Sequence, residues 1–199
     1  MPGLRVRPQP RNEQGAVLEV TPESAGWTYV GFKVLQLEIG ESTAGGDEGR
    51  EACIIVLSGK CDVEVGGQTF ESIGGRTSVF DDAAPAAVYA PGGALYAITA
   101  RTKVEIAIGT APGAGGEARL ISPGSIAKET RGEGTNTRYV RNILPESEVA
   151  ESLLIAEVIT PGGNWSSYPP HKHDRLAPPE ESSLEEIYYH RLNPTQGFA

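Results

Sequence analysis

The sequence predicts an all-β protein, built as a sandwich or barrel of short antiparallel strands. Three observations support this prediction. Apolar and polar residues alternate with a period of two in many short segments, glycines and prolines interrupt those segments, and few windows place apolar residues at helical spacing. Glycine (25) and proline (15) make up about a fifth of the 199 residues, without the period of collagen. A chain of this length can bury roughly 70% of the surface of its unfolded state, which suffices for a core without disulfides.

The alternation is clearest in two segments, residues 62–65 (DVEV) and 103–109 (KVEIAIG). Each segment has one apolar and one polar face, as expected of an antiparallel strand that is buried on one side. Gly59 and the pair Gly66-Gly67 are placed as hairpin turns around the first segment. The other predicted strands are, in chain order, residues 29–38, 51–57, 78–80, 94–100, 118–121, 137–140, 153–160 and 186–191.

Pro145 marks a single predicted helical turn at 146–151, because proline is favoured at the first helical position. The glycine-rich segment 111–117 (APGAGGE) and the polar segment 129–137 (ETRGEGTNT) predict a passage between two domains near residues 111–135. The two halves of the chain also resemble each other. VLQLEIGES and then GREACIIVLSG in the first half correspond to LLIAEVITPGG and then EEIYYHR in the second: a strand, a loop, and a strand that opens on a glutamate.

The charge and the composition exclude several classes of protein. A formal net charge of -9 argues against a general binder of nucleic acid or of anionic membranes, since both need a basic face. No apolar run approaches the roughly 20 residues that cross a bilayer, and the N-terminal MPGLRVRPQPR lacks the apolar stretch of a secretory signal. We therefore expect a cytoplasmic protein. Cys53 and Cys61 have no CxxC spacing, so they are expected to be buried, small apolar side chains rather than a disulfide.

The three histidines point to a metal site, because all of them lie in the last 29 residues. His171-Lys172-His173 places two imidazoles two residues apart, on the same face if the segment is extended. Carboxylates follow within 13 residues, and two imidazoles with one carboxylate suit Zn, Fe, Ni or Mn and leave positions for water or substrate. The alternative is a pair of exposed, solvated histidines beside a proline turn.

Which carboxylate would complete the site depends on the register of the segment LEEIYYHR. Glu186, Tyr188 and His190 share one face of an extended strand, and Glu185, Ile187 and Tyr189 share the other. The alternation alone does not choose between the two faces. His190 is separated from Glu186 by about 13 Å along a strand, too far for both to bind one metal ion.

Four segments resemble the 5-deoxy-glucuronate isomerase family, relatives of the cupin-type uronate isomerases. They are GGNWSSYPPHKHD (162–174), PPEESSLEEIYYHRLNPTQGFA (178–199), RYVRNILPE (138–146) and EACIIVLSGKCDVEVGG (51–67). The resemblance implies two cupin barrels of jelly-roll type: residues 1–115 as an N-terminal cupin without a metal motif, and residues 116–199 as a linker and the first part of a metal-binding cupin. Family members continue past the final QGFA, so the second barrel is expected to be incomplete in this chain.

The resemblance also implies the ligands of the metal. The HxH motif of the family falls on His171 and His173, and the glutamate before the aromatic strand falls on Glu186, with Glu185 as the alternative. A divalent metal is expected, Zn first, with Mn and Fe as alternatives. Around residues 41–43, where the first cupin would carry its own HxH, the chain has no histidine.

By the same resemblance, the protein acts on a small sugar acid, converting 5-deoxy-glucuronate to 2-deoxy-5-keto-gluconate in myo-inositol catabolism through an enediolate. Arg175 is the predicted partner of the substrate carboxylate, and Trp165 a predicted wall for the sugar ring, with Lys172 and Tyr168 as weaker candidates. The catalytic base is left open among Glu185, Glu181 and Tyr188. The alternatives are a non-enzymatic sugar-binding cupin and a metal-dependent cupin oxygenase; no nucleic-acid or membrane partner is expected, and a homo-oligomer is left open.

Overall fold

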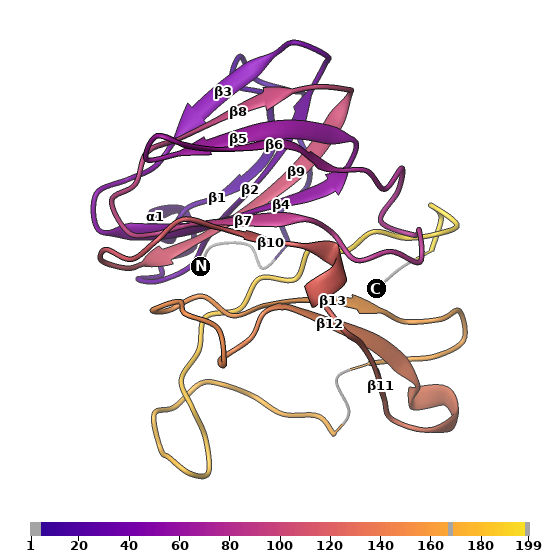
Figure 1. Ribbon diagram of the computed structural model, residues 1–199. Helices are drawn as coiled ribbons and strands as arrows, with labels where there is room; N and C mark the ends of the chain where they lie inside the picture. The colour runs from indigo at the N-terminus through magenta and orange to yellow at the C-terminus, as the bar shows by residue number, and fades with distance from the viewer. Residues whose placement is uncertain (1–4, 167–168, 198–199) are drawn as a thin grey trace.

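A six-stranded antiparallel sheet forms the middle layer of the molecule (Figure 1). The computed structural model describes residues 5–166 and 169–197. The strands of the middle sheet are, in order across the sheet, β1 (Ala16–Val20), β2 (Gly31–Leu37), β9 (Val104–Pro112), β4 (Arg50–Ser58), β7 (Ala87–Ala90) and β10 (Arg119–Ile121). Each neighbouring pair is antiparallel, which gives the middle layer a continuous ladder of hydrogen bonds.

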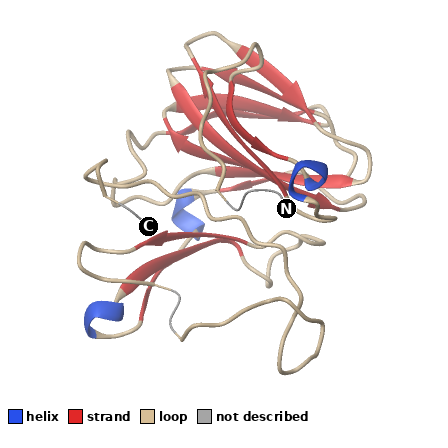
Figure 2. Ribbon diagram, turned by 180° about the vertical axis from the view of Figure 1, so that it is seen from behind, coloured by secondary structure: helices blue, strands red, loops and turns tan. Residues whose placement is uncertain are grey.

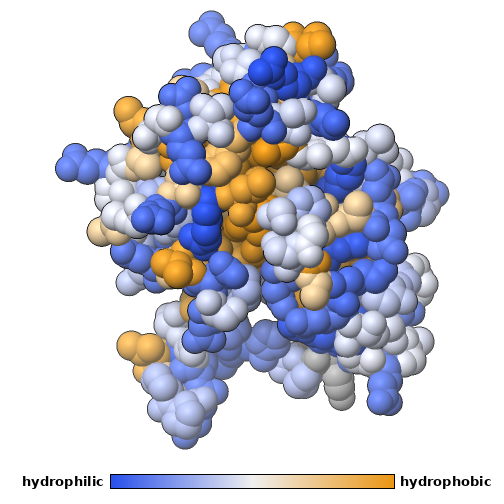
Figure 3. All heavy atoms as spheres, in the orientation of Figure 1, coloured by the Kyte–Doolittle hydropathy of each residue, from blue (hydrophilic) through white to orange (hydrophobic). Residues whose placement is uncertain are grey.

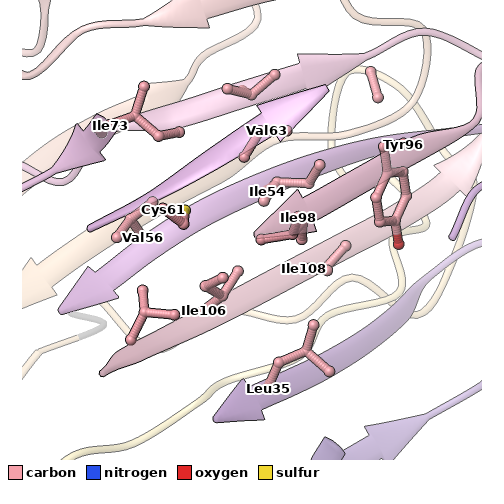
Figure 4. Packing of buried hydrophobic residues seen from close by; sticks show 14 of the residues in the cluster. Leu35, Ile54, Val56, Cys61, Val63, Ile73, Tyr96, Ile98, Ile106 and Ile108 are labelled. Carbon is pink, nitrogen blue, oxygen red and sulfur yellow. The ribbon is translucent and has the colours of Figure 1, made fainter. Parts of the chain in front are cut away.

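A four-stranded antiparallel sheet lies above the middle sheet in Figure 1 and completes a sandwich. The apolar faces of the two sheets meet in a closed core. Figure 4 shows Ile54 and Ile106 of the middle sheet packed with Val63 and Ile98 of the upper sheet, all four fully buried. The strands of the upper sheet are, in order, β3 (Ser42–Gly45), β8 (Tyr96–Ala100), β5 (Lys60–Val65) and β6 (Gln68–Gly74).

A three-stranded antiparallel sheet lies against the other face of the middle sheet (Figure 1). Strand β4 is therefore buried on both faces. Ile54 and Val56 point into the sandwich core. Ile55 and Leu57 pack in a second core with Leu144 and other residues between 126 and 153. This explains why the segment reads as a continuous apolar run. The strands are β11 (Lys128–Arg131), β12 (Arg138–Leu144) and β13 (Ile155–Ile159); the short helical elements are α1 (Pro22–Ala25), η1 (Pro123–Ser125) and η2 (Gly134–Asn136).

A buried ionic network joins the sandwich to the three-stranded sheet. Arg76 of the sandwich contacts Glu157 of β13 at 2.7 Å, and Arg141 of β12 contacts the same carboxylate at 3.0 Å. Arg141 also bonds Asp82 at 2.7 Å. The side chains of the two arginines are only 2% and 4% exposed, and both buried guanidiniums share the Glu157 carboxylate as a counter-charge.

The predicted all-β class is confirmed, and most predicted strands are present. Gly66 and Gly67 form the two-residue turn between β5 and β6, both with positive φ, and Gly59 links β4 to β5 at φ 83°. Cys53 and Cys61 are free and buried, as predicted, and burial raises the pKa of each thiol to about 12. The sequence reasoning did not find β1, β3, β6, β7 and β11.

Three predicted elements are wrong. Residues 78–80 form a turn rather than a strand, because the Asp81 carboxylate accepts the N–H groups of Thr77 and Ser78. Residues 146–151 form turns and bends rather than a helical turn. Residues 186–191 are not assigned to a strand, although their side chains alternate between two faces.

The extent of the middle sheet bears on the predicted division of the chain at 115/116. Strand β10, at residues 119–121, pairs with β7 and so belongs to the middle sheet. The two-domain boundary itself stays a prediction. No helix among residues 5–166 and 169–197 is both long and apolar enough to cross a membrane.

Candidate metal-binding site

His171 and His173 lie in an irregular hairpin formed by residues 171–184, which we call the HxH hairpin. Ala177 and Glu181 exchange two backbone hydrogen bonds at its tip, of 2.9 and 3.1 Å. Closer to the histidines, the N–H of Leu184 donates to the carbonyl of His173 at 3.1 Å. The two imidazole rings are 5.1 Å apart and nearly perpendicular. The hairpin therefore gathers the predicted histidine pair.

The Nδ1 atom of each imidazole already has a hydrogen-bond partner. Nδ1 of His171 lies 3.0 Å from the carbonyl of Pro169, and Nδ1 of His173 lies 3.1 Å from the carbonyl of Ser182. A carbonyl only accepts, so each neutral imidazole donates from Nδ1 and keeps its lone pair on Nε2. This is the tautomer that binds a metal through Nε2, with the other nitrogen fixing the orientation of the ring. The pair thus fits a metal ion chemically.

Glu181 anchors the histidine-bearing arm of the hairpin. Its carboxylate accepts the N–H groups of Asp174 and Arg175 at 2.8 and 3.0 Å, and it also bonds Nζ of Lys172 and Nε of Arg175. The Glu181 side chain is only 8% exposed. The bond from Lys172 and these further donors lower the pKa of Glu181 to about 2. Glu181 is therefore a fixed anion of the loop and not a group that exchanges protons near neutral pH.

The structure places the two basic candidates beside this anchor. The ammonium of Lys172, between the two histidines in sequence, is bonded to Glu181. Arg175 uses Nε for the same carboxylate, while its side chain stays 72% exposed. Whether Arg175 meets a substrate carboxylate stays a prediction.

Glu185 is bound to the first half of the chain. Its carboxylate accepts three consecutive N–H groups, those of Thr28, Tyr29 and Val30, at 2.8, 2.7 and 2.9 Å. Burial acts to raise the pKa of Glu185, but the three N–H donors outweigh burial and lower it. A carboxylate with this many donors is poorly available to a metal ion or to a proton.

The face of Glu185 is the inward face of its segment. Ile187 and Tyr189 are half-buried, and the ring of Tyr189 lies 5.7 Å from that of Phe32 on β2. The opposite face is exposed. The hydroxyl of Tyr188 lies 3.4 Å from the Glu186 carboxylate, and the Tyr188 and His190 rings stack at 6.1 Å. Glu185 thus lies on the inward face of its segment and Glu186 on the exposed face.

The complete three-ligand site stays a prediction. Over residues 5–166 and 169–197, no group of three or more His, Cys, Asp and Glu side chains lies close enough to hold a metal ion. His171 and His173 are together, whereas Glu186 does not join them in this arrangement. Glu186 is nevertheless close to the pair in sequence register, because it lies two residues after Leu184, which is bonded to His173.

The aromatic candidates lie just before the hairpin. Trp165 is 60% exposed, so its side chain is on the surface and not in a core, while its backbone N–H donates to the carbonyl of Thr135 at 2.9 Å. Its predicted contact with a sugar ring is untested. Tyr168 lies outside the described residues. Figure 3 shows apolar side chains gathered in the middle of one face of the molecule.

Sequence reasoning missed the structural role of Glu51. This carboxylate is fully buried and accepts the hydroxyl of Tyr89 and the N–H groups of Glu151, Ser152 and Leu153. Burial acts to raise the pKa of Glu51, but these donors lower it overall. The signal available in the sequence was a glutamate at the start of an otherwise apolar strand.

Comparison with known proteins identifies the family. The model of the KduI/IolB family matches residues 4–199. The chain is 50% identical over 188 residues to a 5-deoxy-glucuronate isomerase of Geobacillus kaustophilus (94% of this chain, 68% of the relative) and 45% identical over 184 residues to that of Bacillus subtilis strain 168 (92% and 68%). The crystal structure of an IolB-like protein from Salmonella typhimurium LT2 superposes with a TM-score of 0.90 at 45% identity, over 94% of this chain and 72% of the other. The chain therefore belongs to the KduI/IolB family.

Proposed function

We propose that this protein is a sugar-acid isomerase that converts 5-deoxy-glucuronate to 2-deoxy-5-keto-gluconate in myo-inositol catabolism. The observation that carries the proposal is the 50% identity, over 94% of the chain, to a relative named 5-deoxy-glucuronate isomerase. The family match runs from residue 4 to residue 199 and so includes the HxH hairpin. The substrate is an aldose and the product a ketose, so the reaction moves the carbonyl from C1 to C2 in the numbering of the substrate.

We further propose that a divalent metal, Zn or alternatively Mn or Fe, binds Nε2 of His171 and His173 with Glu186 as the third ligand. The Nδ1 hydrogen bonds and the 5.1 Å ring separation support the histidine pair. The pairing of the two hairpin arms supports Glu186. Leu184 is bonded to His173, so continuing two residues away from the tip on each arm brings His171 opposite Glu186 in the sequence register. When bound, the metal would act as a Lewis acid on the adjacent oxygens of the sugar.

The chain's own residues have separate roles in this proposal. Arg175, within the HxH hairpin, has an exposed side chain whose guanidinium suits bidentate recognition of the substrate carboxylate, and Trp165 offers an exposed ring for the sugar. Of the three candidates for the base, Glu181 and Glu185 are each bonded to several donors, and the pKa of each is lowered. These contacts leave Tyr188 as the candidate on the same face as Glu186.

We also propose that the protein works in the cytoplasm on a free small molecule, with no nucleic-acid or membrane partner and with self-association left to measurement. The two free, buried cysteines support a reducing compartment. Fractionation of cells of the source organism tests the compartment, and sedimentation of the purified chain tests whether it forms a homo-oligomer.

The enzymatic proposal is tested by following 5-deoxy-glucuronate by proton NMR in the presence of the purified protein. We expect the ketose to accumulate, accumulation to stop after treatment with a chelator, and Zn²⁺ or Mn²⁺ to restore it. Tight sugar binding without turnover, unaffected by the chelator, would instead support a non-enzymatic cupin. Oxygen consumption with ferrous iron would support an oxygenase.

A further inference from the structure

Glu51 and Glu185, the glutamates at the start of GREACIIVLSG and EEIYYHR in the repeated sequence pattern, make matching contacts in opposite directions. Glu51 lies in β4 of the first half and accepts the N–H groups of residues 151–153 of the second half, at 2.9, 2.7 and 2.8 Å. Glu185 lies in the second half and accepts the N–H groups of residues 28–30 of the first half, at 2.8, 2.7 and 2.9 Å. Each carboxylate therefore binds three consecutive N–H groups of the other half.

The two bound loops hold equivalent places in the fold. Residues 28–30 lead directly into β2, and residues 151–153 lead into β13, the two strands that the sequence pattern pairs as VLQLEIGES and LLIAEVITPGG. Phe32 of β2 and Ile155 of β13 both pack against the second core. The contact thus shares one property with a two-fold interface: each half of the chain gives a carboxylate and receives one.

Further side chains reinforce the contacts of both carboxylates. Glu51 is fully buried and has Tyr89 as a fourth donor, so its charge is compensated without water. The loop that binds Glu185 is itself fixed by Arg50, which donates from Nη2 to the carbonyl of Tyr29 at 2.6 Å. Hydrogen bonds from N–H groups to an ionised carboxylate are among the stronger ones in proteins.

We propose that Glu51 and Glu185 form a reciprocal clasp between the two halves of the chain, and that Glu185 is the positioning residue for Glu186. Neighbouring side chains of an extended segment point to opposite faces. With Glu185 fixed on residues 28–30, Glu186 must point away from the first half, on the face that it shares with Tyr188 and His190. The part of the inference that concerns Glu186 rests on the proposed metal site, whereas the clasp does not.

Hydrogen exchange of individual amides tests the clasp. In Glu185→Ala we expect the amides of residues 28–30 to exchange about 10- to 100-fold faster, the equivalent of losing hydrogen bonds to a charged group, while those of residues 151–153 keep their protection. Glu185→Gln should lie between, because one oxygen can still accept the N–H groups of Tyr29 and Val30. Unchanged protection of residues 28–30 in Glu185→Ala would overturn the clasp.

Calorimetric titration with Zn²⁺ tests the positioning of Glu186. We expect Glu185→Ala to weaken Zn²⁺ binding about 10- to 100-fold, as loss of a residue that orients a metal ligand does. Glu186→Ala should weaken Zn²⁺ binding but keep residues 28–30 protected. Glu180→Ala, which removes an exposed carboxylate nearby, should change neither the Zn²⁺ affinity nor the protection of residues 28–30.

Wild-type Zn²⁺ affinity in a Glu185→Ala variant whose residues 28–30 have lost their protection would overturn the positioning role. Failure of the wild-type protein to bind Zn²⁺ would instead contradict the proposed metal site, and the exchange result would still decide the clasp.

Discussion

At the scale of single residues, this protein repeatedly uses one carboxylate to fix a loop. Glu51, Glu181 and Glu185 each accept two or more backbone N–H groups from residues that have no ladder partner for them. An ionised carboxylate has about four acceptor sites, so one side chain satisfies several donors that would otherwise be left unpaired. Two of the three candidate bases, Glu181 and Glu185, are bound in this way.

Replacing Glu181 tests whether this residue anchors the histidine-bearing arm or acts as the catalytic base. We expect Glu181→Ala to weaken Zn²⁺ binding about 10-fold or more, because the arm that carries His171 and His173 loses its fixed contacts. Glu181→Gln should keep most of the affinity, since a single oxygen, Oε1, accepts the N–H groups of Asp174 and Arg175. Calorimetry with Zn²⁺ measures both. If Glu181 were the base, Glu181→Gln would likewise keep its Zn²⁺ affinity but would lose about 100-fold or more in kcat, whereas an anchor replaced by Gln keeps most of its kcat.

At the scale of elements, the pattern of burial explains which strands the sequence could predict. Strand β5 is buried on one side and alternates cleanly, and β4 is a nine-residue run of mostly apolar residues, so both give a recognisable pattern. Strand β7 is four residues long and buried throughout, which leaves no alternation to detect. Strand β11 is exposed throughout, so it has no apolar face.

The candidate site could be predicted only in part for a similar reason. The spacing of His171 and His173 is local, and the two imidazole rings lie 5.1 Å apart. Which of Glu185 and Glu186 faces the first half depends on Thr28, Tyr29 and Val30, which lie more than 150 residues earlier. No pattern within LEEIYYHR contains that information.

The ionic network between the layers should be sensitive to its shared carboxylate. We expect Glu157→Ala to lower the free energy of unfolding by about 3 kcal/mol or more, because it leaves the buried guanidiniums of Arg76 and Arg141 without their common partner. Lys103→Ala breaks an exposed pair with Glu38 and should cost about 1 kcal/mol or less. Urea titrations of both variants provide the comparison. Equal effects in the two variants would contradict a structural role for the buried network.

At the scale of the whole molecule, one sheet supplies both cores. The middle sheet faces the upper sheet on one side and the three-stranded sheet on the other, and Figure 2 shows the same three layers from behind. The chain spans 68% of the length of the Geobacillus kaustophilus relative. Residues 185–189 contact the first half through Glu185 and Tyr189, so the end of the described chain is linked to its beginning.

The anchoring carboxylates predict how the stability of the whole molecule depends on pH. The pKa of each of Glu51 and Glu185 is lowered in the folded state, and the pKa of Glu181 is lowered to about 2. A lowered pKa adds stability that is fully present above the ordinary value, near 4.5, and that is lost as the pH falls through the folded value. We expect the free energy of unfolding to fall steadily between pH 4.5 and about 2. Urea titrations over this range measure it, and stability that rises or stays flat would contradict the assignment.

The central claim is that His171 and His173 hold the metal of a KduI/IolB isomerase. The most direct measurement is the metal content of the purified protein after equilibration with Zn²⁺, for the wild type and for the His171→Ala/His173→Ala double variant, with His190→Ala as the control. We predict one Zn²⁺ per chain in the wild type and in His190→Ala, and none in the double variant. A double variant that retains its full metal content would contradict the claim.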